Sequence, residues 1–94
     1  MPVENNTQWE KQEDWENFVN ICEEYWHDTP LQLKLLQLLE NNKDIAIVVN
    51  YHLTDSAIDW LYRKVPALGN LMPIECLKSE ALKIKLKEAL WQMP

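Results

Sequence analysis

Apolar residues recur every three or four positions in the first third of the chain, which is the spacing of one face of an α-helix. Thr7 and Glu10 stand three apart, as in a capping box, and predict that this helix begins near Thr7. We expect the polar residues 1–6 to be loose and the helix to continue to about residue 28. The predicted buried stripe comprises Trp15, Phe18, Val19, Cys22, Tyr25 and Trp26.

A second helix is predicted over residues 30 to about 41. Thr29 is placed to cap it, Pro30 takes the first helical position, and Gln32 completes the reciprocal cap. Asn41 and Asn42 are expected to end it. Leucines occur around most of its circumference, so we expect either the central element of the fold or a dimer interface. They are Leu31, Leu33, Leu35, Leu36, Leu38 and Leu39.

Residues 44–53 fit two secondary structures. Ile45, Ile47 and Val49 alternate with other residues as in a strand, and Tyr51 and Leu53 continue the alternation, whereas Asp44 could cap a helix. Since no other segment has a strand pattern to pair with, a strand here would leave its backbone hydrogen bonds unmade. We therefore predict a helix.

The second half continues with helical patterns. Thr54 is predicted to cap a helix over residues 55 to about 64, which ends before Pro66. Its predicted buried face comprises Ala57, Ile58, Leu61, Tyr62 and Val65.

The segment after Pro66 predicts a loop and two more helices. Residues 66–70 form a loop around Gly69, and Pro73 begins a short helical turn to about residue 77. Ser79 is predicted to cap the last helix. The apolar repeat of that helix comprises Leu82, Leu86, Ala89, Leu90 and Met93.

These patterns predict an all-α fold, a small bundle of about five to six helices. A chain of 94 residues has room for one core, so we expect residues 1–52, an acidic helical region, to pack on residues 53–94 as one folding unit. A single Gly argues against a turn-rich β protein, and five Trp indicate a small core filled by large side chains.

The charge distribution bears on the class of partner. The formal net charge is −6, and residues 1–44 hold ten Asp and Glu against three Lys and Arg. An acidic surface repels phosphate backbones, so we expect no direct nucleic-acid binding. Two cysteines in apolar helical patterns and no signal peptide indicate a reduced, cytoplasmic protein. No apolar run is long enough to span a membrane.

The sequence offers little for catalysis or cofactor binding. Cys22, His27, His52 and Cys76 could in principle bind zinc, but neither pair has the usual short spacing. Cys76 and His52 could act as nucleophile and base, yet no Gly-rich turn accompanies them. No phosphate-binding or dinucleotide motif is present. We expect a protein that is not an enzyme and that binds no metal or cofactor.

Three motifs in the second half are specific. They are Ala57-Ile58-Asp59-Trp60-Leu61, Val65-Pro66-Ala67-Leu68-Gly69-Asn70 and Met72-Pro73-Ile74-Glu75-Cys76-Leu77. In this order and spacing, the segment from about residue 53 to residue 91 resembles the toxin-binding domain of the MbcA/ParS/Xre antitoxins. That family has a second Gly where this chain has Asn70, and Thr where it has Met72. Residues 1–52 carry no such resemblance.

The resemblance implies a cytosolic antitoxin domain that binds a toxin of the RES type, a family acting on NAD, and covers its active site. Applied to this chain, the resemblance implies that the end of the last helix blocks the active site of the toxin, with Trp91 and Met93 as apolar anchors. The predicted partner-binding residues are Arg63, Lys64, Asn70, Lys87, Trp91, Gln92, Met93 and Pro94. We also expect a homodimer through the second helix or the faces beside it.

Two other functions stay open. The chain could be a phage or mobile-element inhibitor whose acidic first helix blocks a nucleic-acid-binding complex. In that case Glu13, Asp14, Glu16, Glu23 and Glu24 would carry the binding, and salt would weaken it steeply. It could also be a transcriptional regulator with a degenerate DNA-binding region, although its charge argues against operator binding.

Overall fold

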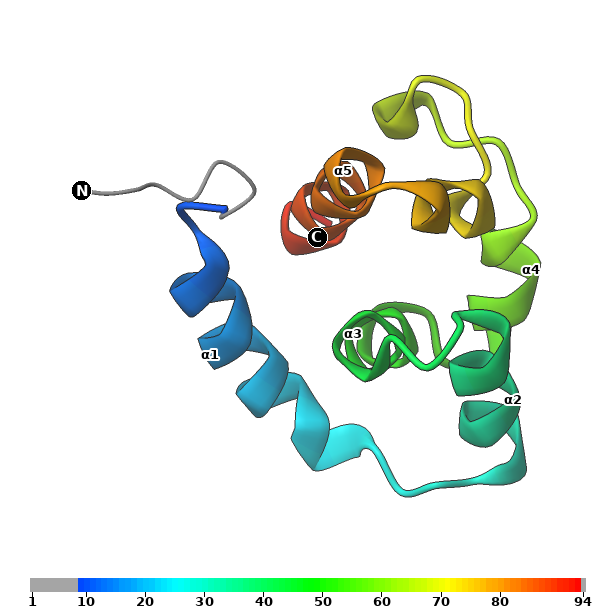
Figure 1. Cartoon of the computed structure of the whole chain (residues 1–94). Coiled ribbons are helices and arrows are strands. Elements are labelled where there is room, and N and C mark those ends of the chain that lie inside the picture. Colours follow the sequence, from blue (N-terminus) through cyan, green and yellow to red (C-terminus); the bar gives the residue numbers. More distant parts are fainter. Residues whose placement is uncertain (1–8, 94) are drawn as a thin grey trace.

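The helix Lys43–Leu53 (α3) runs through the centre of the structure, and residues 45–50 on it are all buried. The computed structural model describes residues 9–93. Figure 1 shows α1 (Gln12–Cys22) along one side of α3, α2 (Pro30–Leu38) and α4 (Ala57–Leu61) on the opposite side, and α5 (Glu80–Trp91) next to α3. No strand occurs between residues 9 and 93, so the predicted all-α bundle is confirmed, as is the helix predicted at residues 44–53.

The central position belongs to α3 and not to the leucine-rich α2. Residues 45–49 are all apolar, so α3 can be buried on every side. On α2 the leucines alternate with Lys34 and Gln37, which are exposed, and Leu33 itself is 49% exposed. The prediction that α2 is the central element is therefore wrong.

The first helix is shorter than predicted. It begins at Gln12 after Lys11, whose side chain makes no capping bond, and Thr7 lies outside the described residues. It ends at Cys22 and is followed by a 3₁₀ turn, η1 (Glu23–Tyr25). The chain then becomes extended at Trp26 and left-handed at Asp28, with φ 55°. Since Thr29 precedes Pro30, it too is extended, which prevents the helix from continuing.

The predicted cap of α2 is confirmed, but its predicted end is not. Gln32 N–H donates to Thr29 Oγ1 and Thr29 N–H donates to Gln32 Oε1, each at 3.2 Å. The helix ends at Leu38 because Glu40 and Asn41 are left-handed, with φ 56° and 65°. Asn41 N–H then closes the end by donating to the Leu36 carbonyl at 2.9 Å.

Thr54 does not cap a helix as predicted. It has φ 42° and ψ −111°, follows the last residue of α3, and begins a 3₁₀ turn, η2 (Thr54–Ser56). The helix α4 covers only residues 57–61, because the chain leaves helical geometry before Arg63. The shorter helix also changes the buried face, since Trp60 is buried and Tyr62, predicted to be inside, is 50% exposed.

The loop and the final helix follow the sequence prediction closely. The 3₁₀ turn η3 (Pro66–Leu68) is followed by Gly69 at φ 71°, and Val65 N–H donates to the Leu71 carbonyl across the loop at 3.0 Å. A second 3₁₀ segment, η4 (Pro73–Lys78), leads to Ser79, whose Oγ accepts from Leu82 N–H at 3.2 Å. Each helix found in residues 9–93 is too short or too polar to cross a bilayer.

Candidate protein-binding site

The end of α5 and the start of α1 together form a small open groove of about 300 Å³, here called the C-terminal groove. Its lining residues are Lys11, Asp14, Glu88, Trp91 and Gln92. Trp91 is partly buried and packs edge-on against Trp9, with ring centroids 5.9 Å apart. Trp9 Nε1–H in turn donates to Glu88 Oε2 at 3.2 Å. Two of the predicted partner-binding residues, Trp91 and Gln92, therefore line one concave surface.

Lys87 is engaged within the protein. Its Nζ lies 3.5 Å from Asp44 Oδ2 and 5.8 Å from the ring centroids of both Trp9 and Trp15. Trp15 Nε1–H donates to the same Asp44 oxygen at 3.0 Å. Only 14% of the Lys87 side chain is exposed, so this cation joins α5 to α1 and α3 and offers little surface to a partner.

The other predicted partner-binding residues lie in different places. Arg63, Lys64 and Asn70 are exposed at the end of α4 and in the loop that follows. Figure 1 shows this loop apart from the C-terminal end of α5, so the structure does not bring the two groups together. Met93 is partly buried against the core, and Pro94 lies outside the described residues.

A chain of aromatic rings connects the C-terminal groove to the far end of α1. Starting at Trp91, each ring lies 5.4 to 6.3 Å from the next by centroid. The order is Trp91, Trp9, Trp15, Phe18, Tyr51 and Tyr25. All five contacts are tilted or edge-to-face, which are favourable geometries for aromatic pairs. The rings in the middle of this aromatic series lie in the core, and the rings at its two ends reach the surface.

At the Tyr25 end of this aromatic series lies an exposed surface that the sequence pattern does not predict. Phe18, Tyr25, Tyr51 and His52 are joined by ring contacts, and Ile21 follows Phe18 by three residues on α1, which places it on the same side of the helix; these five residues are here called the aromatic face. Ile21 is 62% exposed, Tyr25 53% and Tyr51 39%. The prediction that Tyr25 belongs to the buried stripe is wrong, because the change to 3₁₀ geometry at Glu23 turns its ring outward. The one signal in the sequence was Ile21, an apolar residue that falls outside the helical stripe.

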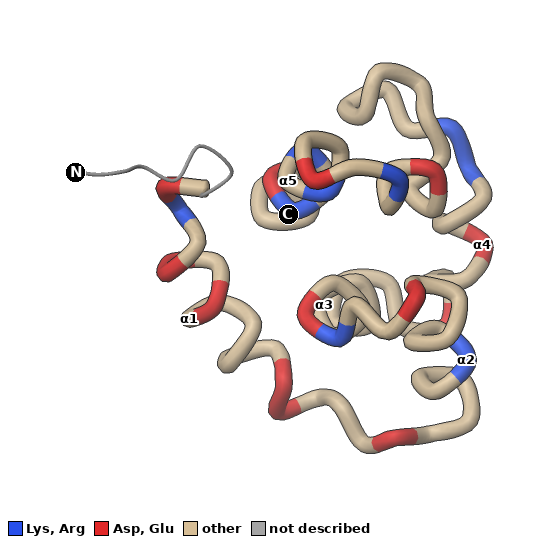
Figure 2. Tube along the Cα trace, in the orientation of Figure 1, with Lys and Arg blue, Asp and Glu red and all other residues tan. Residues whose placement is uncertain are grey.

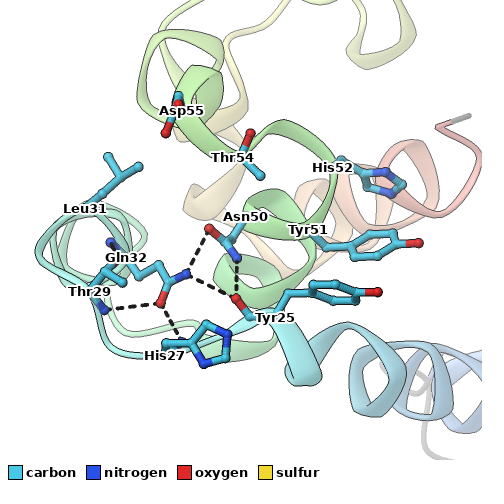
Figure 3. Close-up of a pocket in the computed structure, with 10 residues that line it drawn as sticks. All are labelled: Tyr25, His27, Thr29, Leu31, Gln32, Asn50, Tyr51, His52, Thr54 and Asp55. Atoms are coloured by element: carbon cyan, nitrogen blue, oxygen red, sulfur yellow. Dashed lines mark hydrogen bonds between the residues drawn. The ribbon is translucent and has the colours of Figure 1, made fainter.

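Beside the aromatic face lies a larger open groove of about 710 Å³, here called the polar groove. Its lining residues are Tyr25, His27, Thr29, Leu31, Gln32, Asn50, Tyr51, His52, Thr54 and Asp55. Figure 3 shows Tyr25 and Tyr51 side by side at one end and Asp55 at the other.

The wall of the polar groove is held by two buried amides. Gln32 Nε2–H and Asn50 Nδ2–H both donate to the Tyr25 carbonyl at 3.2 Å, and Gln32 Nε2–H also donates to Asn50 Oδ1 at 3.3 Å (Figure 3). Gln32 Oε1 accepts from His27 N–H at 2.7 Å. The bonds fix the η1 to α2 connection against α3, so the position of Tyr25 is determined by the core.

The residues considered for metal binding and catalysis are dispersed. Cys22 and Cys76 are free, buried thiols. Burial raises the pKa of Cys22 to about 11, and burial together with the Glu75 carboxylate raises the pKa of Cys76. Within residues 9–93 no three His, Cys, Asp or Glu side chains are grouped so that they could hold a metal ion.

Among residues 9–93, His52 is the one titratable group with an unpaired buried atom. Its Nε2 has no hydrogen-bond partner among the described residues. Burial lowers the pKa of His52, and the Leu90 backbone opposes part of that shift. The neutral imidazole, which contacts Phe18 and Tyr51, is therefore the favoured protonation state of His52 at neutral pH.

Charges of both signs occur on several helices. Figure 2 shows mostly carboxylates along α1 and η1, both signs on α5, and Lys and Arg beyond the end of α4. All of Glu13, Asp14, Glu16, Glu23 and Glu24 are exposed.

Comparison of the chain with protein-family models, with curated proteins and with solved structures gives no match. Proposals about its function therefore rest on the residues and on the geometry of these surfaces.

Proposed function

We propose that this chain is a protein-binding domain that inhibits a partner by covering its active site, in the manner that its resemblance to antitoxins implies. The observation that supports this most directly is Trp91, a large aromatic residue placed at the C-terminal groove and backed by Trp9. Aromatic side chains held in position at a surface are the commonest energetic centres of protein interfaces. The proposed partner is a toxin of the RES type.

The test is affinity capture with the full chain from the cells that produce it, followed by identification and assay of the captured protein. We expect its NAD consumption to fall to background at one equivalent of the chain. Capture of a protein whose activity is unchanged by excess chain would contradict the proposal.

Trp91→Ala tests the position of the contact. Removal of residues 89–94 would also delete Leu90, which is fully buried, so a point variant is the cleaner probe. We expect Trp91→Ala to weaken partner binding by about 30-fold or more and to lower the free energy of unfolding by only about 1 kcal/mol. Tyr62→Ala is the matched control, since Tyr62 is 50% exposed on another surface. Calorimetry measures the partner affinity, and urea unfolding measures the free energy of unfolding. Equal losses of binding free energy and of unfolding free energy would assign Trp91 to the core.

A second candidate function is supported by the exposed carboxylates of α1. The segment from residue 12 to residue 33 contains no Lys or Arg, so it presents negative charge alone. Such a surface suits an inhibitor that occupies the nucleic-acid site of another protein. Displacement of the chain by DNA or RNA from the captured protein would favour this function over the first.

A further inference from the structure

We propose that the aromatic face is a docking site for a basic amphipathic helix of the partner protein. This inference rests on the proposed function, because it names the chemistry of the surface that the domain recognises.

The apolar contribution comes from large side chains that are exposed yet fixed. Ile21 and Tyr25 are both more than half exposed. The Tyr25 and Tyr51 rings lie 5.4 Å apart, and Phe18 supports Tyr51 edge-on at 6.2 Å. Since the amides of Gln32 and Asn50 hold the Tyr25 backbone, the rings lose little conformational freedom on binding. Exposed aromatic residues in fixed positions are typical of interface centres.

The charge around this face selects the partner. The two segments that build it, residues 18–28 and residues 50–55, contain four Asp and Glu and no Lys or Arg. The four carboxylates, Glu23, Glu24, Asp28 and Asp55, are all exposed. A surface of this kind attracts Lys and Arg and repels nucleic-acid phosphate and anionic lipid. The complementary occupant is apolar in its middle and basic at its edges.

The polar groove gives that occupant a direction. It begins at Tyr25 and Tyr51, on the aromatic face, and ends at Thr54 and Asp55 (Figure 3). A helix whose apolar residues repeat every three or four positions can place them on the rings. Its flanking Lys or Arg side chains can then pair with exposed carboxylates, Glu24 beside Tyr25 in the sequence and Asp55 in the lining of the polar groove.

Three synthetic peptides of about 18 residues test this chemistry. The first is an amphipathic helix with a Leu and Trp stripe and Lys flanks, the second has Glu in place of each Lys, and the third is a scramble of the first. We expect the basic peptide to bind the full chain at least about tenfold more tightly than the other two, with an affinity that falls as salt rises. Shifts of backbone amide resonances should map to residues 18–25 and 50–55. Equal binding of the basic peptide and its scramble would overturn the proposal.

Paired variants locate the site. Ile21→Lys places a positive charge in the aromatic face at a position that is 62% exposed, so the fold should be kept. We expect it to weaken peptide binding about tenfold or more, while Tyr62→Lys, at a comparably exposed position just after α4, changes it less than about twofold. Glu24→Lys should weaken binding more than Glu80→Lys, which makes the same change of net charge at the start of α5. Circular dichroism checks the fold of each variant.

The outcomes separate this inference from the proposed function. If Ile21→Lys abolishes peptide binding and also releases the captured partner, both stand. If the partner is captured and inhibited equally by wild type and Ile21→Lys, the function stands and the inference fails. If wild type forms dimers that Ile21→Lys dissociates, the face is an interface between two copies of this chain and the inference fails.

Discussion

At the scale of single residues, the structure distinguishes cations that look alike in the sequence. Lys83 and Lys87 stand one helical turn apart on α5 and both pair with a carboxylate. Lys83 meets Glu80 at 3.6 Å, with 26% of the Lys83 side chain and 66% of the Glu80 side chain exposed. Lys87 meets Asp44 between two indole rings. The second pair is screened less by water, so its contribution to stability should be larger.

Lys87→Met tests this difference. The substitution keeps an unbranched apolar stem and removes the charge, and we expect the free energy of unfolding to fall by about 1–2 kcal/mol. Lys83→Met, the control, should lower it by less than about 0.5 kcal/mol. Urea unfolding followed by Trp fluorescence measures both. Equal effects would mean that the aromatic surroundings add nothing to the Lys87 pair.

His52 predicts a pH dependence of stability. Because burial lowers its pKa in the folded chain, the unfolded chain binds a proton first as the pH falls below 6.5. The free energy of unfolding should therefore decline as the pH falls below 6.5. Well above that pH, His52 is neutral in both the folded and the unfolded chain, so it should not change the free energy of unfolding. We expect His52→Gln to remove part of the decline between roughly pH 7.5 and 5.5. An unchanged decline in His52→Gln would contradict the assignment.

At the scale of elements, the junction between α3 and α4 carries the clearest backbone strain. Thr54 has φ 42° and ψ −111°, a conformation that a β-branched residue rarely adopts. The other left-handed residues besides glycine, Asp28, Glu40, Asn41 and Asn70, lie at φ 55° to 65° within the described residues, closer to the ordinary left-handed well. The strain sits at one end of the polar groove, where α3 stops.

Thr54→Gly should relieve that strain. We expect the free energy of unfolding to rise by about 1 kcal/mol, because Gly adopts this conformation at no steric cost. Thr29→Gly serves as the opposite control, since it deletes the cap of α2 and should not stabilise the chain. Thermal unfolding by calorimetry compares the two. A lower free energy of unfolding in Thr54→Gly would show that the threonine side chain contributes more to stability than its strained backbone costs.

The individual elements also show which features the sequence could predict and which it could not. The caps at Thr29 and Ser79 depend on residues within three positions, so they were predicted correctly. The ends of α1 and α4 depend on where the chain must turn to pack, so the outward placement of Tyr25 and Tyr62 was missed. The helix at residues 44–53 was predicted by elimination of a strand, but its central position was not, because that depends on all the helices around it. Of the candidate site, Trp91 and Gln92 were placed at one groove, whereas the aromatic face combines two segments about 30 residues apart that no local pattern connects.

At the scale of the whole molecule, the two cysteines are reporters of unfolding. Both are fully buried, and both have a raised pKa, so neither offers a reactive thiolate at neutral pH. Cys22 lies on α1 and Cys76 in η4, on different sides of α3.

Thiol labelling therefore tests whether the domain opens as one unit. We expect an aromatic disulfide reagent to modify both cysteines at the same rate, roughly a thousandfold more slowly than in the urea-unfolded chain. Single variants Cys22→Ala and Cys76→Ala identify each rate. Faster labelling of Cys22 alone would show that α1 detaches from α3 while the rest stays folded.

The central position of α3 also has a consequence for biosynthesis. Residues 45–50 leave the ribosome before α5, which is needed to cover them, has emerged. Until residues 80–91 emerge, a nascent chain presents an apolar helix that α1 and α2 shield only in part. Nascent-chain chaperones should therefore associate with the chain most strongly in the interval between the emergence of α3 and the emergence of α5.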